Sequence, residues 1–347
     1  MTLAFAPFAL DLAAPLSTAA GDIERREGFL VRVDHRGVTG VGEATPLPGW
    51  TESLAACETA LETAAGAARE GARGALLELD AGSVPAARCG VATALLDADA
   101  RAEGVPLHEW LDDGAHPGRV PVNATLGDGD PGETAAAASA AVEAGFECLK
   151  VKVGARPIPS DRERLTAIRE AVGDGVTLRA DANGAWSRGE AERALDALAD
   201  AGVTLVEQPL APEDLAGHAD LRGRGVEIAL DEALAVHDAA TVLDADAADA
   251  LVLKPMVLGG PGDAHTIARR ARERGIEPIV TTTVDGVVAR TAAVHVAAAT
   301  PDVRPCGLAT GDLLASDLGP DPAPVADGAI AVPQDPGLGI DPSEVEP

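Results

Sequence analysis

From about residue 120 onward, short apolar segments alternate with longer stretches rich in Ala, Glu and Arg that have helical spacing. Several helical stretches end at a glycine just before the next apolar segment, as at Gly145, Gly175 and Gly202, a common way for a helix to stop. The strand-like segments lie near residues 120–126, 147–153, 176–182, 203–207, 227–231, 250–256, 278–284 and 303–308. Eight such units in succession require parallel strands with right-handed crossovers. The sequence therefore predicts an α/β fold, a closed (β/α)-barrel of modified TIM-barrel type, over residues 119–310.

The first 118 residues have a different pattern. Residues 27–34 and 37–44 form two apolar, strand-like runs around His35-Arg36-Gly37, and helical segments follow at 51–72 and 85–103. We therefore expect a separate α+β domain over residues 1–118, in front of the barrel. The segment 311–347 is rich in Pro, Asp and Gly and contains one strand-like piece at 329–332. We expect this segment to fold back onto the first domain.

The composition narrows the class of protein. The net charge is −29, with acids spread over the whole length, which argues against nucleic-acid binding because that needs a basic surface. The same excess of acids resembles proteins adapted to a very salty cytoplasm and predicts an extreme halophile as the source. The four cysteines show no close pairing, no signal peptide is evident, and no apolar run approaches the roughly 20 residues that span a bilayer. We expect a cytoplasmic protein without membrane contact, and the sequence leaves a homo-oligomer open.

Only three lysines occur, Lys150, Lys152 and Lys254, against twenty-four arginines. All three lie in apolar, strand-like runs, where an unused surface lysine is not expected. Arginine cannot release its proton because its pKa stays above about 12, whereas a buried lysine can approach neutrality and act as a base. The alternative is that rare residues fell here by chance. The sequence favours lysines that were kept because a proton must move.

A set of charged side chains follows the barrel spacing at the strand ends. Successive members are separated by 29, 26, 24 and 23 residues, each close to one strand–helix unit: Lys152, Asp181, Glu207, Asp231 and Lys254. The carboxyl ends of barrel strands form one rim, where catalytic residues collect, so we expect these side chains to lie side by side. Lys150 precedes Lys152 by two positions and therefore points the same way, into the barrel.

The three carboxylates of this set, Asp181, Glu207 and Asp231, would repel one another without a divalent cation between them. Ligands that are all oxygen favour Mg²⁺, with Mn²⁺ as a substitute. The alternative is that acids, 56 of 347 residues, fell at three successive strand ends by chance. A metal flanked by lysines suits the removal of a proton next to a carboxylate group, because the metal stabilises the enediolate while a lysine takes the proton. We therefore expect a small-molecule carboxylate as the substrate.

Five short motifs occur in a fixed order along the barrel half of the chain. They are Lys-Val-Lys at 150–152, Asp-Ala-Asn-Gly-Ala-Trp at 181–186, Glu-Gln-Pro at 207–209, Asp-Glu-Ala at 231–233 and Leu-Lys-Pro at 253–255. In this order they resemble the enolase superfamily, and within it the muconate-lactonizing subgroup. Residues 42–50 are similar to the mobile loop of that superfamily's capping domain, which closes over the substrate. The resemblance runs from about residue 20 to 315 and implies an N-terminal capping domain completed by the C-terminal segment.

The resemblance also implies a role for individual residues. Lys152 would be the base, Lys254 would steady the enolate from the opposite face as a cation, and Lys150 would tune Lys152. Asp181, Glu207 and Asp231 would bind Mg²⁺. The remaining candidates would support the metal and the lysines or contact the substrate: Arg179, Asn183, Glu232, Trp50, Thr283, Asp285 and Gly307.

Residues 281–286 and 300–314 are similar to the o-succinylbenzoate synthases of menaquinone biosynthesis. That likeness implies a hydro-lyase, which converts 2-succinyl-6-hydroxy-2,4-cyclohexadiene-1-carboxylate to o-succinylbenzoate by syn loss of water. Lys152 would take the α-proton and return it to the departing hydroxyl. One departure is that Asp285 stands where a glutamate is common in the family.

Other reactions stay open at this point. The chief alternative is an N-succinylamino acid racemase or dipeptide epimerase, in which Lys152 and Lys254 would work on opposite faces; a muconate cycloisomerase is a further variant. Dipeptide epimerases usually carry Asp-x-Asp at the eighth strand, whereas this segment reads Cys306-Gly-Leu-Ala-Thr310. A glycosidase with a carboxylate pair, or a non-catalytic scaffold, would leave the lysines unexplained.

Overall fold

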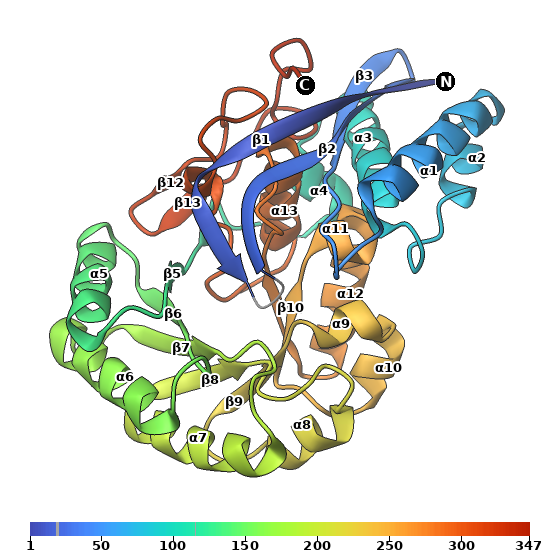
Figure 1. Ribbon diagram of the computed structural model, residues 1–347. Helices are drawn as coiled ribbons and strands as arrows, with labels where there is room; N and C mark the ends of the chain where they lie inside the picture. Colours follow the sequence, from blue (N-terminus) through green and yellow to red (C-terminus); the bar gives the residue numbers. More distant parts are fainter. Residues whose placement is uncertain (19–20, 115) are drawn as a thin grey trace.

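The computed structural model describes residues 1–18, 21–114 and 116–347 (Figure 1). Its centre is a sheet of seven parallel strands that neighbour one another in sequence order. The strands are β5 (Ala124–Leu126), β6 (Cys148–Lys152), β7 (Thr177–Asp181), β8 (Val203–Glu207), β9 (Glu227–Leu230), β10 (Ala250–Leu253) and β11 (Glu277–Val280). The predicted α/β barrel is confirmed, because parallel strands in sequence order with a helix between each pair curl into this shape.

The helices lie on the outside of the curved sheet (Figure 1). The longer ones are α5 (Pro131–Glu143), α6 (Ile158–Val172), α7 (Arg188–Asp200), α12 (Pro261–Glu273) and α13 (Val287–Ala298), and the shorter ones are α8 (Leu215–Leu221), α9 (Ala233–Val236), α10 (Ala239–Asp244) and α11 (Pro255–Leu258). Strand residues that face outward, such as Leu149 and Val151, pack with Leu165 and Ile168 of α6 in the barrel's main apolar core. This alternation leaves the intervening side chains pointing into the barrel.

The predicted eighth strand at 303–308 is wrong as a regular strand. The segment joins the barrel through isolated parallel bridges, from Cys306 to Val122 and from Gly307 to Thr281. The backbone of Gly307 lies close to the Thr281 side chain, since a Cβ atom at Gly307 would lie 2.5 Å from the Thr281 hydroxyl oxygen. Two bridges close the barrel without the run of pairings that defines a strand, which is why a short apolar run misled the prediction.

The N-terminal domain is an antiparallel sheet covered by helices. Its strands are β1 (Thr2–Thr18), β2 (Gly21–His35) and β3 (Val38–Ala44), and its helices are α1 (Leu54–Ala67), η1 (Ala68–Glu70), α2 (Ala72–Leu77), α3 (Pro85–Glu103) and α4 (Leu107–Leu111). The β2–β3 pair and α3 agree with the sequence expectation, whereas β1 was not predicted. The helical segment expected over 51–72 comprises α1 and η1, and Gly71, with φ +104°, separates η1 from α2.

The C-terminal segment packs against the N-terminal domain, as we expected from its sequence. The backbone N–H of Leu107 donates to the carbonyl of Gly337 at 2.7 Å, and that of Leu338 donates to the buried carboxylate of Asp97 at 2.7 Å. The 3-10 turn η2 (Gly311–Leu313) opens the segment, and its strands β12 (Val325–Ala326) and β13 (Ala329–Ala331) form a small sheet with β4 (Arg119–Pro121). The exact boundaries at 118 and 310 stay predictions.

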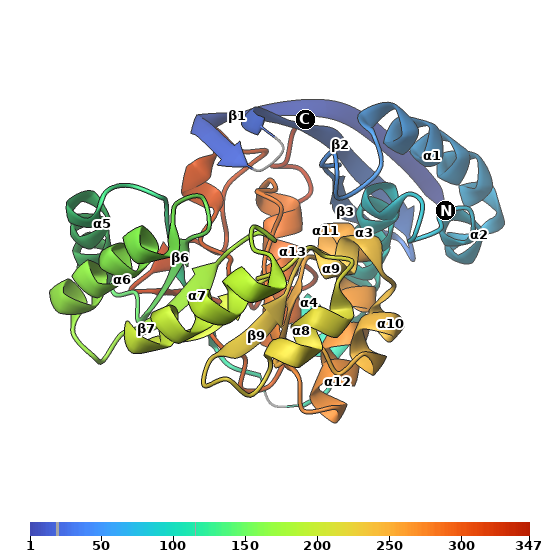
Figure 2. The same cartoon turned by 60° about the horizontal axis from the view of Figure 1, so that its bottom comes forward.

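The capping domain lies beside the barrel, and its β1–β2 hairpin extends across it (Figures 1 and 2). Among the described residues, no helix is both long and apolar enough to cross a membrane. The arrangement leaves one rim of the barrel next to the capping domain, and the predicted site residues lie there.

Candidate active site at the barrel rim

Strand β6 places two lysines on the inner face of the barrel. Leu149 and Val151 are fully buried in the outer core, so Lys150 and Lys152 point inward, as expected from the twofold alternation of a strand. The side chain of Lys152 is 40% exposed, whereas that of Lys150 is 17% exposed. Lys152 is therefore the lysine of this pair that a molecule in the barrel mouth can reach.

The three carboxylates occupy neighbouring strand ends and are almost fully buried. Asp181 pairs with Glu207 across β7 and β8, and Glu207 pairs with Ala229 of β9, two residues before Asp231. Their exposed fractions are 1%, 3% and 4% for Asp181, Glu207 and Asp231. The sequence expectation that these side chains lie side by side is met by the strand register.

The lysines and the carboxylates form one network. The Lys150 amine lies 2.9 Å from a Glu207 oxygen and 3.0 Å from an Asp181 oxygen. The Lys152 amine donates to Asp181 at 2.8 Å. On the far side of the same three strands, the Lys254 amine donates to both oxygens of Asp231, at 2.7 and 2.5 Å. Lys152 and Lys254 thus approach the carboxylate set from strands that flank it on both sides.

Trp50 of the capping domain covers Lys254. The Lys254 amine lies 3.5 Å from the centroid of the Trp50 ring, a cation–π contact. The contact of Trp50 with substrate stays a prediction; the ring meets a lysine of the barrel, and the residue is half-buried. One side of the site is therefore built by the capping domain.

Burial and charge shift the acids of the network in opposite directions. Burial alone would raise the pKa of Asp181, but Lys150 and Lys152 outweigh it and hold that pKa below its usual value. Burial together with the nearby Asp181 raises the pKa of Glu207 to about 7. Burial raises the pKa of Asp231 to about 6 against the effect of Lys254. The lysines therefore outweigh burial at Asp181, whereas burial outweighs them at Glu207 and Asp231.

Lys150 is held as a cation. Burial on its own would lower the pKa of Lys150, but Asp181 and Glu207 outweigh burial and raise the pKa above the usual lysine value. A lysine with a raised pKa keeps its proton and supplies fixed positive charge. This state suits the expected supporting role of Lys150 rather than the role of a base.

Asn183 and Glu232 extend the network, as the sequence analysis expected. The side-chain oxygen of Asn183 accepts from the Lys152 amine at 2.8 Å, and its amide nitrogen donates to Glu232 at 2.8 Å. Asn183 adopts φ +44°, a left-handed conformation that asparagine tolerates better than most residues. Asn183 therefore links the lysine of β6 to an acid beside Asp231.

Two supporting residues were missed by the sequence analysis. The buried side-chain oxygen of Gln208 accepts from the backbone N–H groups of Asp231 and Ala233, at 3.1 and 3.2 Å. The buried guanidinium of Arg164 donates to the carbonyl of Lys152 at 3.0 Å. Gln208 lies inside the Glu-Gln-Pro motif, so that motif was the available signal, whereas nothing in the sequence around Arg164 marks its contact with Lys152.

Four predicted site residues lie outside this network. Arg179 donates to the carbonyl of Pro305 at 2.7 Å, and Gly307 pairs with Thr281, so both help to close the barrel. The Thr283 backbone N–H donates to the Asp285 carboxylate at 3.1 Å, and Asp285 lies beside Arg26 of the capping domain. Thr283 and Asp285 were predicted to lie near the substrate. In the structure their contacts lie at the junction of the two domains. Their distance from the lysines in sequence had concealed this junction.

The donor set can be tested for Mg²⁺. Within the described ranges, no group of three or more His, Cys, Asp or Glu side chains lies close enough together to hold a metal ion, and each carboxylate is instead hydrogen-bonded to a lysine. The chemistry nevertheless fits a hard divalent cation, because the donors of Asp181, Glu207 and Asp231 are all buried oxygens at adjacent strand ends. Four acids, counting Glu232, face three amines, so the acids outnumber the cations of the protein at this place.

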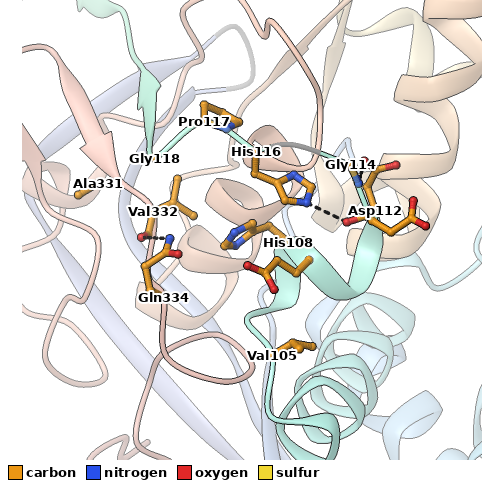
Figure 3. A pocket seen from close by; sticks show the side chains of 12 residues that line it. Val105, His108, Asp112, Gly114, His116, Pro117, Gly118, Ala331, Val332 and Gln334 are labelled. Atoms are coloured by element: carbon orange, nitrogen blue, oxygen red, sulfur yellow. Dashed lines mark hydrogen bonds between the residues drawn. The ribbon is translucent and has the colours of Figure 1, made fainter.

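A hollow of about 690 Å³ lies elsewhere, lined by α4, the 112–118 segment and the C-terminal segment (Figure 3). Figure 3 shows His108 and His116 in it, and His116 lies 2.8 Å from the carbonyl oxygen of Asp112. Behind it, His108 stacks on His295 with ring centroids 5.3 Å apart. Burial lowers the pKa of His295 to about 3, so this ring is a neutral packing element. None of the lining residues belongs to the lysine–carboxylate network.

The fold and the site together define an α/β-barrel enzyme with a capping domain and a rim of lysines and carboxylates. Residues 133–346 match the family described as enolase C-terminal domain-like, and residues 2–111 match the N-terminal domain of mandelate racemase and muconate lactonizing enzyme. The chain therefore belongs to the enolase superfamily, as its motifs had indicated.

Individual relatives point to particular reactions. The chain is 31% identical to the L-Ala-D/L-Glu epimerase of Bacillus subtilis, over 96% of this chain and 94% of that protein. The dipeptide epimerase of Enterococcus faecalis V583, solved with Mg and the dipeptide L-Leu-L-Tyr, superposes with a TM-score of 0.86 at 28% identity, covering 98% of this chain and 99% of that one. The N-succinyl Arg/Lys racemase of Bacillus cereus ATCC 14579 superposes with a TM-score of 0.87 at 25% identity, covering 98% and 95%.

Proposed function

We propose that this enzyme removes the proton next to the carboxylate group of a small substrate, with Lys152 as the base and Mg²⁺ as the cofactor. The observation that carries the proposal is the placement of Lys152 and Lys254, which reach one buried carboxylate set from strands on both of its sides. A carbon acid of this kind needs a base, a counter-charge and a fixed orientation, and the rim offers all three.

Each residue has a distinct part in this chemistry. Lys152 takes the proton, and Asn183 and Asp181 orient its amine. Lys150 stays charged and holds Asp181 and Glu207 in place. Asp181, Glu207 and Asp231 would hold Mg²⁺, which when bound supplies stabilisation of the negative charge that develops on the substrate carboxylate. Lys254, covered by Trp50, faces the reacting carbon from the other side.

Among the similar proteins, the dipeptide epimerases and the racemase favour proton transfer between the two faces of one carbon as the overall reaction, whereas the muconate cycloisomerases found beside them support cycloisomerisation as a further candidate. In the proton transfer between faces, Lys152 removes the proton from one face and Lys254 returns a proton to the other, so an amino-acid centre is inverted. The named activities of the similar proteins, epimerisation of dipeptides and racemisation of N-succinyl amino acids, are reactions of this kind. Among such substrates we favour an N-acylated amino acid, because the 306–310 segment carries no carboxylate to bind a free ammonium group.

A second candidate is the syn-dehydration that forms o-succinylbenzoate. The observation that favours it is the sequence of residues 281–286 and 300–314, together with the absence of an acid from Cys306 to Thr310. In that reaction Lys152 takes the α-proton and returns it to the leaving hydroxyl on the same face, so Lys254 needs only to remain a cation. The comparisons with known proteins support the racemase and epimerase reactions better than this one.

One experiment separates the two candidates. The purified protein is incubated in D₂O with Mg²⁺ and N-succinyl amino acids, the dipeptide L-Ala-L-Glu, or the cyclohexadiene substrate. For the first reaction we expect deuterium at the α-carbon, with loss of optical activity for an N-succinyl amino acid or formation of the second diastereomer for the dipeptide. For the second we expect an aromatic absorbance. If none of these substrates exchanges a proton or forms product, the proposed base chemistry is wrong.

The cellular setting is a further part of the proposal. The net charge of −29 suits a cytoplasm rich in salt. Mn²⁺ can replace Mg²⁺ at oxygen ligands, so we expect it to support activity as well. We expect the melting temperature to rise as KCl is increased from millimolar to molar concentration, because salt screens repulsion among the exposed acids. A melting temperature that falls with salt would contradict the halophilic origin.

A further inference from the structure

The segment that joins β3 to α1 fastens the capping domain to the barrel. Residues 41–46 are buried, whereas Pro48 and Gly49 are exposed. The turn that follows is internally bonded, since the N–H groups of Trp50 and Thr51 both donate to the carbonyl of Leu47, at 3.0 and 2.9 Å. We call residues 45–50 the strap. It continues from the buried end of β3 and ends in a hydrogen-bonded turn.

At the base, Glu43 caps a helix of the other domain. Its carboxylate accepts from the backbone N–H groups of Gly286 and Ala289, at 2.7 and 3.0 Å, at the start of α13. These groups have no partner inside the helix, and the positive end of the helix dipole favours a carboxylate there. A Cβ atom at Gly286 would lie 2.9 Å from the Glu43 carboxylate, so the two segments are in close contact.

Further along, the strap contacts the turn that carries Lys254. The backbone N–H of Thr45 donates to the sulfur of Met256, at 3.4 Å, two residues after Lys254. Trp50, five residues beyond Thr45, lies over the amine of Lys254 itself. One short segment of the capping domain thus meets the lysine and its turn at two points.

Arg26 of β2 binds the strap and the barrel together. Its side chain is 3% exposed, and it donates to the carbonyls of Thr45 at 2.9 Å and Pro46 at 3.2 Å. On the barrel side it donates to the carbonyl of Val284 at 3.3 Å and lies 3.9 Å from the Asp285 carboxylate. All three nitrogens of this guanidinium therefore donate hydrogen bonds at the junction of the two domains.

We propose that Arg26 is a positioning residue, which fixes the strap Thr45–Trp50 to the barrel and thereby holds Trp50 against Lys254. The likeness of residues 42–50 to a mobile loop implies a segment that opens and closes. The contacts of Glu43, Thr45 and Arg26 instead make its base a fixed part of the barrel wall. The catalytic consequence rests on the proposed function, whereas the packing consequence does not.

Arginine suits this place for a geometric reason. A guanidinium is a flat fork whose donors reach several carbonyls at once, whereas an ammonium is a point charge on a flexible stem. Lysine at position 26 would keep the charge beside Asp285 but would lose the paired contacts to Thr45 and Pro46. Arg26→Lys is therefore the most specific test, because it removes the planar guanidinium with its paired hydrogen bonds and leaves the positive charge.

The packing consequence is measured by fluorescence quenching. Trp110→Phe and Trp186→Phe leave Trp50 as the one tryptophan of the 347-residue chain. In that background we expect Arg26→Lys to raise the acrylamide quenching constant of Trp50 by about twofold or more, because the ring leaves the Lys254 surface. The matched control is Arg101→Lys, since Arg101 ties the capping domain to the C-terminal segment through Asp97 and Ile340. An unchanged quenching constant in Arg26→Lys would overturn the proposal.

The catalytic consequence is measured by a double-mutant cycle. We expect Arg26→Lys to lower kcat/KM by roughly tenfold in the natural chain but by less than about twofold when Trp50 is already leucine, because its effect acts through Trp50. A merely structural arginine would lower kcat/KM equally in both backgrounds, and that result would overturn the positioning role. Arg101→Lys should leave kcat/KM unchanged in both.

A second variant covers the case in which Arg26→Lys does not fold. Met256→Leu keeps the side-chain volume but removes the acceptor of the Thr45 N–H. We expect the same direction of change in Trp50 quenching from this variant, and an unchanged value would count against the strap. If the natural chain shows no activity on any substrate, the proposed function fails, while the quenching comparison still decides the role of Arg26.

Discussion

Two of the buried charge clusters of this protein use different cations. At the barrel rim the carboxylates of Asp181, Glu207 and Asp231 are met by lysines alone. At the junction between the domains, Arg26 lies beside Asp285, and Arg290 of α13 binds Asp317 and Asp321 at 2.8 and 3.0 Å. Arginine at the junction keeps its positive charge at any physiological pH, whereas the proton transfer proposed for Lys152 requires an amine that can give up a proton.

This contrast gives the rarity of lysine a physical meaning. Elsewhere in the chain a cation has only to pair with an acid or a carbonyl, and arginine does that well at any physiological pH. The three lysines of the whole chain lie within one network at the rim, and there the proposed proton transfer excludes arginine at position 152. The contrast can be tested by replacing a lysine of the rim by arginine and an arginine of the junction by lysine.

The largest effect is expected for Lys152→Arg. The charge stays but the proton cannot be released, so we expect kcat to fall by about 10³-fold or more, as far as for Lys152→Ala. The measurement is α-proton exchange in D₂O, with circular dichroism to show that both variants fold. The matched exchange at the junction is Arg290→Lys, which keeps the charge beside Asp317 and should lower kcat by less than about threefold. Substantial activity in Lys152→Arg would remove Lys152 as the base.

Removal of divalent cations should affect the rim and leave the junction intact. Chelation with EDTA should abolish turnover, and Mg²⁺ should restore it and raise the melting temperature, because an ion that binds only the folded state stabilises it. Asp231→Asn should lose the rise in melting temperature, since one ligand is weakened. Full turnover after exhaustive chelation, or an equal thermal response in Asp231→Asn, would exclude this set as the metal site.

Lys254→Arg distinguishes a lysine that moves a proton from one that only carries charge. If Lys254 returns a proton to the second face, arginine should lower racemisation at least about 100-fold, while exchange of the proton that Lys152 removes persists. If the reaction is the dehydration, Lys254 acts as a cation, and arginine should keep activity within about tenfold. Measuring both reactions on the same variant thus assigns Lys254 to one role, and full racemisation by Lys254→Arg would refute proton transfer by this residue.

The fold was predictable where its cause is local. Helix α3 begins at Pro85 and ends at Glu103, as its spacing and the following Gly104 indicate, and the parallel strands follow from repeated strand–helix units. Strand β1 was missed because its 17 residues include Pro7 and Pro15 and become a strand only by pairing with β2. The pairing is a property of two segments together, which periodicity within one segment does not contain.

The site divides in the same way. The rim residues could be placed because the barrel spacing brings equivalent strand ends to one edge, so their positions follow from counting. Arg26 and Glu43 could not be placed, because their partners at Val284 and Gly286 lie about 240 residues or more away and are mostly backbone groups. Backbone carbonyls and N–H groups are the same at every position, so no residue pattern marks them as partners.

The smallest effect is expected at the junction, for Glu43→Gln as the pH is changed. Burial and the nearby Asp285 raise the pKa of Glu43 from 4.5 to about 7. A carboxyl group with a raised pKa in the folded state favours folding while it is protonated, so its stabilising contribution is present below pH 4.5 and is lost as the pH rises through 7. Glutamine at position 43 does not titrate, and therefore lacks this loss.

The measurement is the free energy of unfolding of both proteins from pH 5 to pH 8. We expect the natural chain to lose stability relative to Glu43→Gln by on the order of 3 kcal/mol across this range. The glutamine also caps α13 less well, but that cost is the same at every pH and shifts only the offset. Glu58→Gln on the exposed face of α1 serves as the matched control for the same substitution at a residue outside the junction. A difference between Glu43→Gln and the natural chain that stays constant with pH would show that the junction, unlike the rim, holds its acid as a permanent anion, and the contrast between the two clusters would then extend to their carboxylates.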